Sequence, residues 1–156
     1  MRIDIYTDGS HLDKQNNGRL GCGGVMIVEG KKIDEFSMEL KPEWLKSFLG
    51  TDRVSNPSAE LLGVLMALKN FKLDPRADIY IHADYIGVKQ WMEGAWKIKE
   101  PYIKIIKDEI DSEIKAKKIK PHFLWVKGHQ NKSVLDPDAR WNNYVDLLAK
   151  GENYVV

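Results

Sequence analysis

The segment Ile3-Asp4-Ile5-Tyr6-Thr7-Asp8-Gly9-Ser10 alternates in character from one residue to the next until it reaches an Asp-Gly pair. This period of two predicts a β-strand that carries Asp8 at its end, and Gly9 predicts a sharp turn directly after it. Asp-Gly is also a common turn pair, so an Asp in this place can be an ordinary strand end. Whether Asp8 has a functional role therefore has to be judged from the other motifs of the chain.

The chain of 156 residues is predicted to form a single domain over residues 1–156. Its hydrophobic content of 43% supports one well-buried core, and the length is too short for two ordinary domains. No apolar run approaches the roughly 18–20 residues of a membrane span, and there is no basic-then-apolar leader. We therefore expect no membrane partner and a cytoplasmic location. The single cysteine, Cys22, excludes an internal disulfide and is interpreted as a packing residue.

Charge is unevenly distributed along the chain, although the net charge is only +1. Residues 89–132 contain 11 basic and 6 acidic side chains. A basic segment is compatible with a phosphate backbone as partner, but a helix with a solvated lysine face gives the same pattern. Charge alone leaves both interpretations open.

Further strands are predicted by apolar runs and turn residues. Residues 25–28 and 32–40 are typical of a hairpin around Glu29-Gly30, and residues 78–84 and 120–129 of two later strands. The glycine-rich residues 21–24 lack the spacing of a phosphate-binding loop.

Helices are predicted from capping residues and apolar stripes. A buried helix should begin with Asn56 as its cap and Pro57 in its first turn, and continue to Phe71. Others are expected after Tyr85, over residues 101–118 and from about 139 to 150, with residues 41–55 as a connection or short helix.

Three further carboxylates stand at positions that allow two interpretations each. Glu60 lies near the start of the buried helix, where the helix dipole favours an anion, but its apolar neighbours call for a counter-charge. Asp84 ends the strand 78–84 and can either cap the next helix or act in a site. Asp146 borders the buried face of the last helix.

Five short motifs, taken together and in order, resemble type 1 ribonuclease H. They are Tyr6-Thr7-Asp8-Gly9-Ser10, Ser55-Asn56 with Ala59-Glu60-Leu61, Ala83-Asp84, Trp125-Val126-Lys127-Gly128-His129, and Asn142 with Asp146-Leu147-Leu148-Ala149-Lys150. The resemblance covers nearly the whole chain and is to the short-handle form with a catalytic domain only. It implies an α/β, ribonuclease H-like fold. In that fold a mixed five-stranded sheet has three antiparallel strands, two more added parallel to the first, and helices packed against it.

The same resemblance implies that Asp8, Glu60, Asp84 and Asp146 converge. Adjacent parallel strands ending in Asp8 and Asp84 would place two carboxylates side by side, which repel each other unless a cation lies between them. Oxygen ligands of this kind suit two Mg²⁺ ions, with Mn²⁺ as a substitute. By similarity to the family, Asp8 bridges both ions, Asp146 helps hold the one that activates water, and His129 assists proton transfer or release of product and metal. His129 can also be read as an ordinary surface histidine.

The resemblance also implies an RNA–DNA hybrid as the substrate. The residues expected to contact it are Gly9, Ser10, Asn56, Trp91, Trp96, Lys97 and Asn142. Three departures from the family limit this transfer. Pro57-Ser58 follows Asn56, where relatives usually have polar or basic side chains. The basic handle around residues 91–102 is short, and the loop from Gln130 to Trp141 is lengthened by Asp136-Pro137-Asp138.

The sequence therefore predicts a monomeric endoribonuclease that hydrolyses the RNA strand of RNA–DNA hybrids by a two-metal-ion mechanism, leaving 5′-phosphate and 3′-hydroxyl ends. Two alternatives remain. One is a non-catalytic nucleic-acid-binding module with a relict site, which the complete set of four carboxylates disfavours because clustered negative charge repels phosphates. The other is a different nuclease or a transposase-like enzyme of the same fold.

Overall fold

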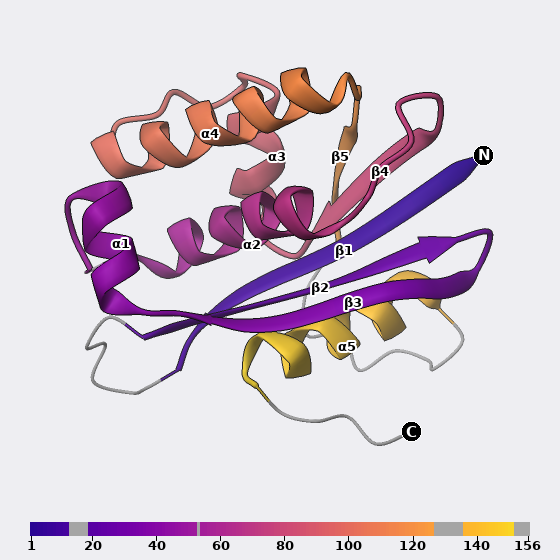
Figure 1. Cartoon of the computed structure of the whole chain (residues 1–156), viewed down its shortest axis with the longest axis horizontal. Helices are drawn as coiled ribbons and strands as arrows, with labels where there is room; N and C mark the ends of the chain where they lie inside the picture. Colours follow the sequence, from indigo (N-terminus) through magenta and orange to yellow (C-terminus); the bar gives the residue numbers. More distant parts are fainter. Residues whose placement is uncertain (13–18, 53, 127–135, 152–156) are drawn as a thin grey trace.

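A single mixed β-sheet organises the chain, with helices on both of its faces (Figure 1). The computed structural model describes residues 1–12, 19–52, 54–126 and 136–151. The strands are β1 (Arg2–His11), β2 (Leu20–Val28), β3 (Lys31–Leu40), β4 (Asp78–Ala83) and β5 (His122–Trp125), in the spatial order β3-β2-β1-β4-β5. β1, β2 and β3 pair antiparallel, whereas β4 pairs parallel with β1 and β5 parallel with β4. The expected five-stranded arrangement is confirmed.

The helices are α1 (Pro42–Leu49), α2 (Asn56–Asn70), α3 (Ile86–Met92), α4 (Pro101–Lys117) and α5 (Pro137–Ala149). Figure 1 shows α2 and α4 above the sheet and α5 alone below it. Residues 41–55, expected to form a connection or a short helix, contain the helix α1. Among the described residues, no helix has the length and apolarity needed to cross a bilayer.

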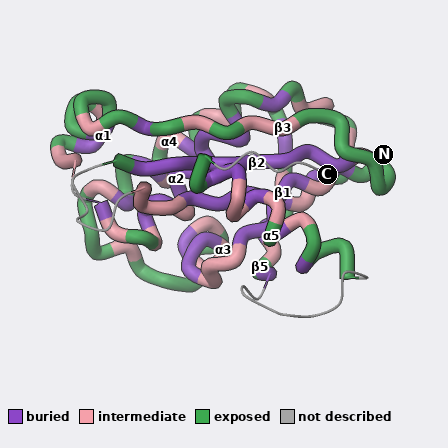
Figure 2. Tube along the Cα trace, turned by 90° about the horizontal axis from the view of Figure 1, so that it is seen from below, coloured by how far each residue is buried: buried purple, intermediate pink, exposed green. Residues whose placement is uncertain are grey.

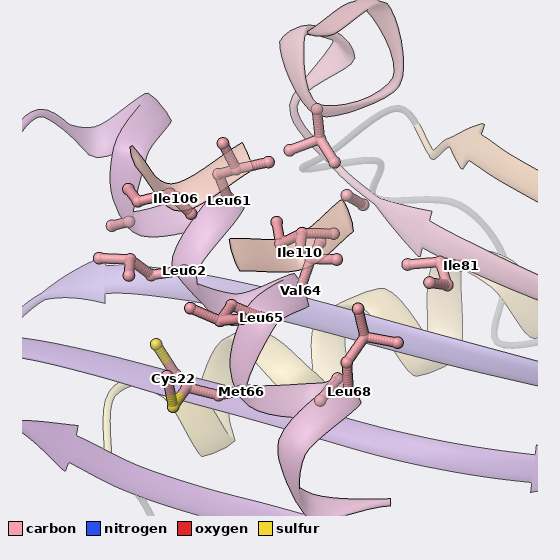
Figure 3. Close-up of a cluster of buried hydrophobic side chains, with 14 of the residues drawn as sticks. Cys22, Leu61, Leu62, Val64, Leu65, Met66, Leu68, Ile81, Ile106 and Ile110 are labelled. Carbon is pink, nitrogen blue, oxygen red and sulfur yellow. The ribbon is translucent and has the colours of Figure 1, made fainter. Parts of the chain in front are cut away.

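The main core lies between the sheet and the helix layer formed by α2 and α4. Every residue of α2 from Leu61 to Leu68 is buried, so this helix is apolar on all sides. Figure 3 shows Leu61, Leu62 and Leu65 packed near Ile106 and Ile110 of α4. A smaller core, made of Tyr6, Val25, Ile27, Val126, Val145 and Leu148, joins the other face of the sheet to α5.

Burial decreases toward the edge of the sheet. In Figure 2 the central strands β1 and β2 and helix α2 are mostly buried, whereas β3 is largely exposed or intermediate. β1 is covered on both faces, so its polar residues Tyr6, Thr7 and Asp8 are buried together with its isoleucines.

The predicted turn after Asp8 is wrong. β1 continues through Gly9 and Ser10 to His11, and these residues pair with Cys22, Gly21 and Leu20 of β2. Gly9 is needed for a close approach instead, because a Cβ atom on it would overlap the backbone carbonyl of Ala59 in α2.

Two helix starts differ from the sequence-based prediction, and a third decides between two interpretations that the sequence left open. Ser55, rather than Asn56, caps α2, and its Oγ accepts a hydrogen bond from the Ser58 amide at 3.4 Å. Asp84 does not cap α3, which begins at Ile86. The segment Asp136-Pro137-Asp138, predicted to be loop, is the start of α5: Asp136 is its cap and Pro137 its first residue.

Candidate active site

Three carboxylates meet where β1, β4 and α2 come together. Asp8 projects from β1, Glu60 from the second turn of α2, and Asp84 from the residue directly after β4. One oxygen from each carboxylate lies within 4.8 Å of the oxygens of the other two. Asp8 is only 2% exposed, so the cluster is not a set of ordinary surface acids.

Strand pairing and two glycines produce this convergence. β1 and β4 run parallel with Tyr6 opposite His82, which brings Asp8 and Asp84 to the same end of adjacent strands. Close approach of α2 to β1 then adds Glu60. It depends on Gly9 in β1 and on Gly63 in α2, since a Cβ atom on Gly63 would lie 2.8 Å from the Asp8 carbonyl oxygen.

Asp146 reaches the same pocket from the other face of the sheet. The pocket has a volume of about 630 Å³ and is lined by Asp8, Gly9, Ser10, Asn56, Pro57, Glu60, Asp84, Tyr85, Asp146 and Lys150. Asp146 lies on α5, where Lys150 Nζ donates to its Oδ2 at 3.0 Å. It therefore lines the pocket without joining the close group of three.

Burial and mutual repulsion raise the pKa values of Asp8 and Glu60. Burial raises the pKa of Asp8 to about 8, and the charge on Asp84 adds to this effect while a hydrogen bond with Glu60 opposes it. The pKa of Glu60 is raised well above its usual value, first by burial and then by the charge on Asp8. Ionising both carboxylates in the absence of a cation is therefore unfavourable.

The donor set fits a hard divalent cation. Glu60 Oε2 is buried and has no hydrogen-bond partner among the described residues, which is costly for a carboxylate oxygen unless something positive binds it. Carboxylate oxygens are the ligands that Mg²⁺ and Mn²⁺ prefer, and no thiol or imidazole belongs to the close group. Asp8, Glu60 and Asp84 can hold such an ion, and Asp146 lies near enough to complete the site.

The other expected site residues that the structure describes fall into three groups. Gly9, Ser10 and Asn56 line the pocket. Trp96 and Lys97 are exposed but outside the pocket, and Trp91 and Asn142 are 8% and 5% exposed. Buried Trp91 contacts Trp96 and Tyr85, so the exposed face of this aromatic cluster belongs to Trp96. His129 lies outside the described residues.

Sequence reasoning missed two polar groups at this site. The Trp125 indole N–H donates to the backbone carbonyl of Asp84 at 3.1 Å, so the end of β5 supports the residue that carries a site carboxylate. Lys150 lines the pocket beside Asp146. The spacing of Asp146 and Lys150, one helical turn, was a visible signal for this ion pair.

Comparison with known proteins agrees with this geometry. The family model described as RNase H matches residues 1–153. The protein named Ribonuclease H of Aeromonas hydrophila is 30% identical over 138 residues, which are 82% of this chain and 79% of that protein. The Ribonuclease H of Pseudoalteromonas atlantica is 27% identical over 157 residues, covering 95% and 88% of the two chains.

Solved structures show the same fold. The crystal structure of LC11-RNase H1 in complex with an RNA/DNA hybrid has a TM-score of 0.72 at 21% identity and covers 97% of this chain and 96% of that one. RNase H1 from Halobacterium salinarum has a TM-score of 0.69 at 20% identity, with 96% and 95% covered.

Proposed function

Because the chain belongs to the ribonuclease H family of metal-dependent hydrolases, we propose that it hydrolyses the RNA strand of RNA–DNA hybrids at the carboxylate pocket. The products are fragments with 5′-phosphate and 3′-hydroxyl ends. The observation that carries this proposal is the group formed by Asp8, Glu60 and Asp84, with its buried and unpaired Glu60 oxygen. A hybrid as the substrate is also supported by LC11-RNase H1, which was crystallised with one.

Two Mg²⁺ ions are the proposed cofactors, and Mn²⁺ is the proposed substitute. Asp8, Glu60, Asp84 and Asp146 are the proposed ligands, because they line one pocket and offer only oxygen atoms. When bound, such ions make a water molecule a stronger nucleophile and stabilise the leaving 3′ oxygen.

The side chains of this chain have distinct parts in the proposed reaction. Asp8, the most buried of the three clustered acids, places a carboxylate at the centre of the site. Glu60 and Asp84 flank it from α2 and from the end of β4, and the Trp125 hydrogen bond fixes the backbone of Asp84. Asp146 is paired with Lys150, so a positive charge already stands on the α5 side of the pocket. His129 is proposed to move a proton near the leaving group.

Substrate contacts are proposed at the rim of the pocket. Asn56 is exposed, lines the pocket and begins the helix that carries Glu60. Gly9 and Ser10 also line the pocket and are proposed to contact the RNA strand, and Trp96 with Lys97 is proposed to contact the DNA strand. A single pocket receives all four carboxylates from one chain, which supports a monomer as the active form. A cytoplasmic location is proposed on the sequence evidence alone.

The rival function, a binding module with a relict site, is disfavoured by the same geometry. Phosphate oxygens cannot approach three clustered carboxylates without a cation between them, and a module that only binds nucleic acid gains nothing from that cluster. The other rival, a different nuclease of the same fold, would differ from the proposed function in its substrate, which would not be the RNA strand of a hybrid.

The testing experiment incubates purified protein with a labelled RNA–DNA hybrid, RNA duplex, DNA duplex and single strands, with Mg²⁺ or with EDTA. We expect metal-dependent cleavage of the hybrid alone. Asp8→Asn should lose at least about two orders of magnitude in rate, because it removes a central anion but little volume. Asp108→Asn, at an exposed carboxylate of α4, is the matched control and should cleave normally. Cleavage of hybrid by Asp8→Asn within tenfold of the wild type would refute this assignment of the site.

A further inference from the structure

A second cluster of polar side chains lies behind the carboxylate pocket and takes no part in the proposed chemistry. It consists of Asp4 and Tyr6 on β1, His82 on β4 and Asp138 in the first turn of α5. Tyr6 and His82 are 4% and 3% exposed, so both lie in the interior between the sheet and α5. Buried polar groups of this kind have to be held by partners.

His82 is fixed on two sides. Its Nε2 lies 2.7 Å from Asp4 Oδ1, and its ring stacks on the Tyr6 ring with centroids 4.2 Å apart and planes 12° from parallel. Asp4 is fixed in turn by Arg2, whose Nε and Nη2 each donate to it at 3.0 Å. His82 Nδ1 is 3.9 Å from Asp138 Oδ1 and makes no hydrogen bond among the described residues. The imidazole therefore connects β4 to β1 and stacks against the Tyr6 ring.

Tyr6 carries this connection across to α5. Its hydroxyl donates a hydrogen bond to Asp138 Oδ1, and Asp138 is held in the helix start because its own amide donates to Asp136 Oδ1 at 3.0 Å. The Asp138 side chain is 52% exposed, whereas the Tyr6 ring is buried. The hydrogen bond is thus the polar attachment of the first turn of α5 to the centre of the sheet.

Register places this cluster directly behind the site. Tyr6 precedes Asp8 by two residues and shares a strand and a face with it, whereas His82 lies two residues before Asp84, which directly follows β4. Two residues of strand correspond to about 7 Å.

The other end of α5 is held by a hydrogen bond and by close packing against β2. Ser37 Oγ donates to the Leu148 carbonyl at 2.5 Å, and Gly23 lies under α5 with so little space that a Cβ atom on it would be 2.6 Å from Leu148 Cβ. Asp146 lies between this contact and the Tyr6–Asp138 hydrogen bond. Between these two contacts, Tyr144 also joins α5 to β3, because its hydroxyl donates to Glu35 Oε1 at 2.6 Å. The position of Asp146 in the pocket depends on how α5 is attached, because Asp146 belongs to none of the elements that carry the three clustered acids.

We propose that Tyr6, held in place by the stacked ring of His82, is a positioning residue that anchors the first turn of α5 through Asp138 and thereby sets Asp146 against the three clustered carboxylates. This inference rests on the proposed function of that pocket. The effect acts through Asp146, because a displacement of about 1 Å of a group in an active site can cost as much as two orders of magnitude in rate.

Activity measurements on three variants test this role. Tyr6→Phe removes the hydroxyl and keeps the ring, Asp138→Ala removes the acceptor at an exposed position, and Asp138→Asn keeps an oxygen acceptor. We expect kcat to fall about tenfold in the first two, with KM for the hybrid within twofold and a higher Mg²⁺ requirement, and to be nearly normal in Asp138→Asn. Tyr102→Phe, on α4 at the opposite face of the sheet from α5, is the matched control and should change nothing. Unchanged kcat in both Tyr6→Phe and Asp138→Ala, or equal losses in Asp138→Ala and Asp138→Asn, would overturn the proposal.

A second measurement does not depend on catalysis. Hydrogen–deuterium exchange of the metal-free protein should show amides of α5 exchanging at least about five times faster in Tyr6→Phe and Asp138→Ala than in the wild type, with α2 unchanged. Equal acceleration in α2 and α5 would mean a general loss of stability and would overturn the anchoring role. If the wild type cleaves no hybrid, the proposed function has failed, whereas local exchange in α5 still decides whether the anchor exists. If Tyr6→Phe does not fold, Asp138→Ala alone decides the outcome.

Discussion

Gly9 of β1 and Ala59 of α2 approach so closely that a Cβ atom on Gly9 would overlap the Ala59 carbonyl group. Each of these two residues is next to a site carboxylate in the chain: Asp8 precedes Gly9, and Glu60 follows Ala59. The backbone contact therefore sets the separation of two of the clustered acids. Gly9 has the role of a spacer in this site, rather than that of the turn residue suggested by its sequence.

Substituting this spacer tests how strongly the fold and the site are coupled. Gly9→Ala should lower the free energy of unfolding by about 1–3 kcal/mol, because α2 has to move away from β1. Since that movement separates Glu60 from Asp8, kcat should fall as well. Gly24→Ala on β2 is a suitable control, because the three atoms nearest to its new methyl group all belong to the ring of Phe36, a side chain that can shift, rather than to backbone. Chemical denaturation and steady-state kinetics measure both effects, and equal behaviour of the two variants would contradict the spacer role.

Trp125 offers a test of how the Asp84 backbone is supported. Trp125→Phe keeps an aromatic ring but removes the N–H that donates to the Asp84 carbonyl. We expect kcat to fall several-fold and the free energy of unfolding to fall by about 0.5–1.5 kcal/mol, the usual net value of one hydrogen bond. Trp44→Phe, at an exposed indole of α1 outside the pocket, serves as the control for kcat. A Trp125→Phe enzyme with full kcat would show that Asp84 needs no such support.

The element order was predictable from sequence because strands and helices leave strong periodic signals in this chain. Alternation around Tyr6 and His82 predicted two strands, and the apolar run after Pro57 predicted the buried helix. The end of β1 was not predictable, because Asp-Gly has the same local meaning in a turn and in a strand crossed closely by a helix. Ser55 and Asn56 are both good caps, so only the backbone could decide between them.

The candidate site shows a similar division. Asp8, Glu60 and Asp84 could be identified because each is a carboxylate with apolar neighbours near the start or the end of an element predicted from the sequence. The family resemblance put them together with Asp146. Their distances could not be predicted, since these depend on Gly9, Gly63 and the placement of α5. The burial of Trp91 was missed for a related reason: its exposure depends on the cluster with Tyr85 and Trp96, which no local pattern reveals.

The raised pKa of Asp8 predicts how stability depends on pH in the absence of metal. Burial raises this pKa from 3.8 to about 8, so between these values the folded protein binds more protons than the unfolded chain. The free energy of unfolding therefore falls as the pH rises through this range. Asp4 acts in the opposite direction, but at lower pH, because its pKa is lowered from 3.8 by hydrogen bonds with Arg2 and His82 that outweigh its burial.

We accordingly expect a higher melting temperature at pH 5 than at pH 8 when calorimetry is done in EDTA. Asp8→Asn cannot ionise at this position, so its melting temperature should change less between the two pH values. Asp108→Asn should keep the pH dependence of the wild type. A wild-type protein that is more stable at pH 8 than at pH 5 would contradict the assigned direction.

Divalent metal should reverse that loss of stability. Mg²⁺ or Mn²⁺ binds the folded arrangement of carboxylates and relieves their repulsion, and a ligand at 100 times its Kd adds about 2.7 kcal/mol to the free energy of unfolding. The increase in melting temperature should be larger at pH 8 than at pH 5, because protons compete for Asp8 and Glu60 at the lower pH. Asp8→Asn should lose most of the increase. An equal metal effect in Asp8→Asn and the wild type would place the bound ion elsewhere.

Recognition of RNA is expected to depend on Asn56. This residue is exposed at the rim of the pocket and is the first residue of α2, one turn before Glu60. A reader and a ligand carried by the same rigid helix keep a fixed separation, which favours a defined register between a bound ribose and the carboxylates. The ribose 2′-hydroxyl is the group that distinguishes RNA from DNA locally, and an amide can both donate to it and accept from it.

The corresponding experiment uses a duplex whose cleavable strand is DNA except for one, two or four consecutive riboses. Cleavage should require several neighbouring riboses, because a single 2′-hydroxyl cannot fix the strand in the pocket. Asn56→Ala should lose much of this cleavage while retaining the metal-induced increase in melting temperature, since Asn56 is not one of the clustered acids. Asn56→Ser keeps a hydroxyl that can donate and accept, so it should retain more activity than Asn56→Ala. Efficient cleavage of all-DNA duplex by the wild type would show that no ribose is read at this site, and a full rate in Asn56→Ala would assign the reading to another residue.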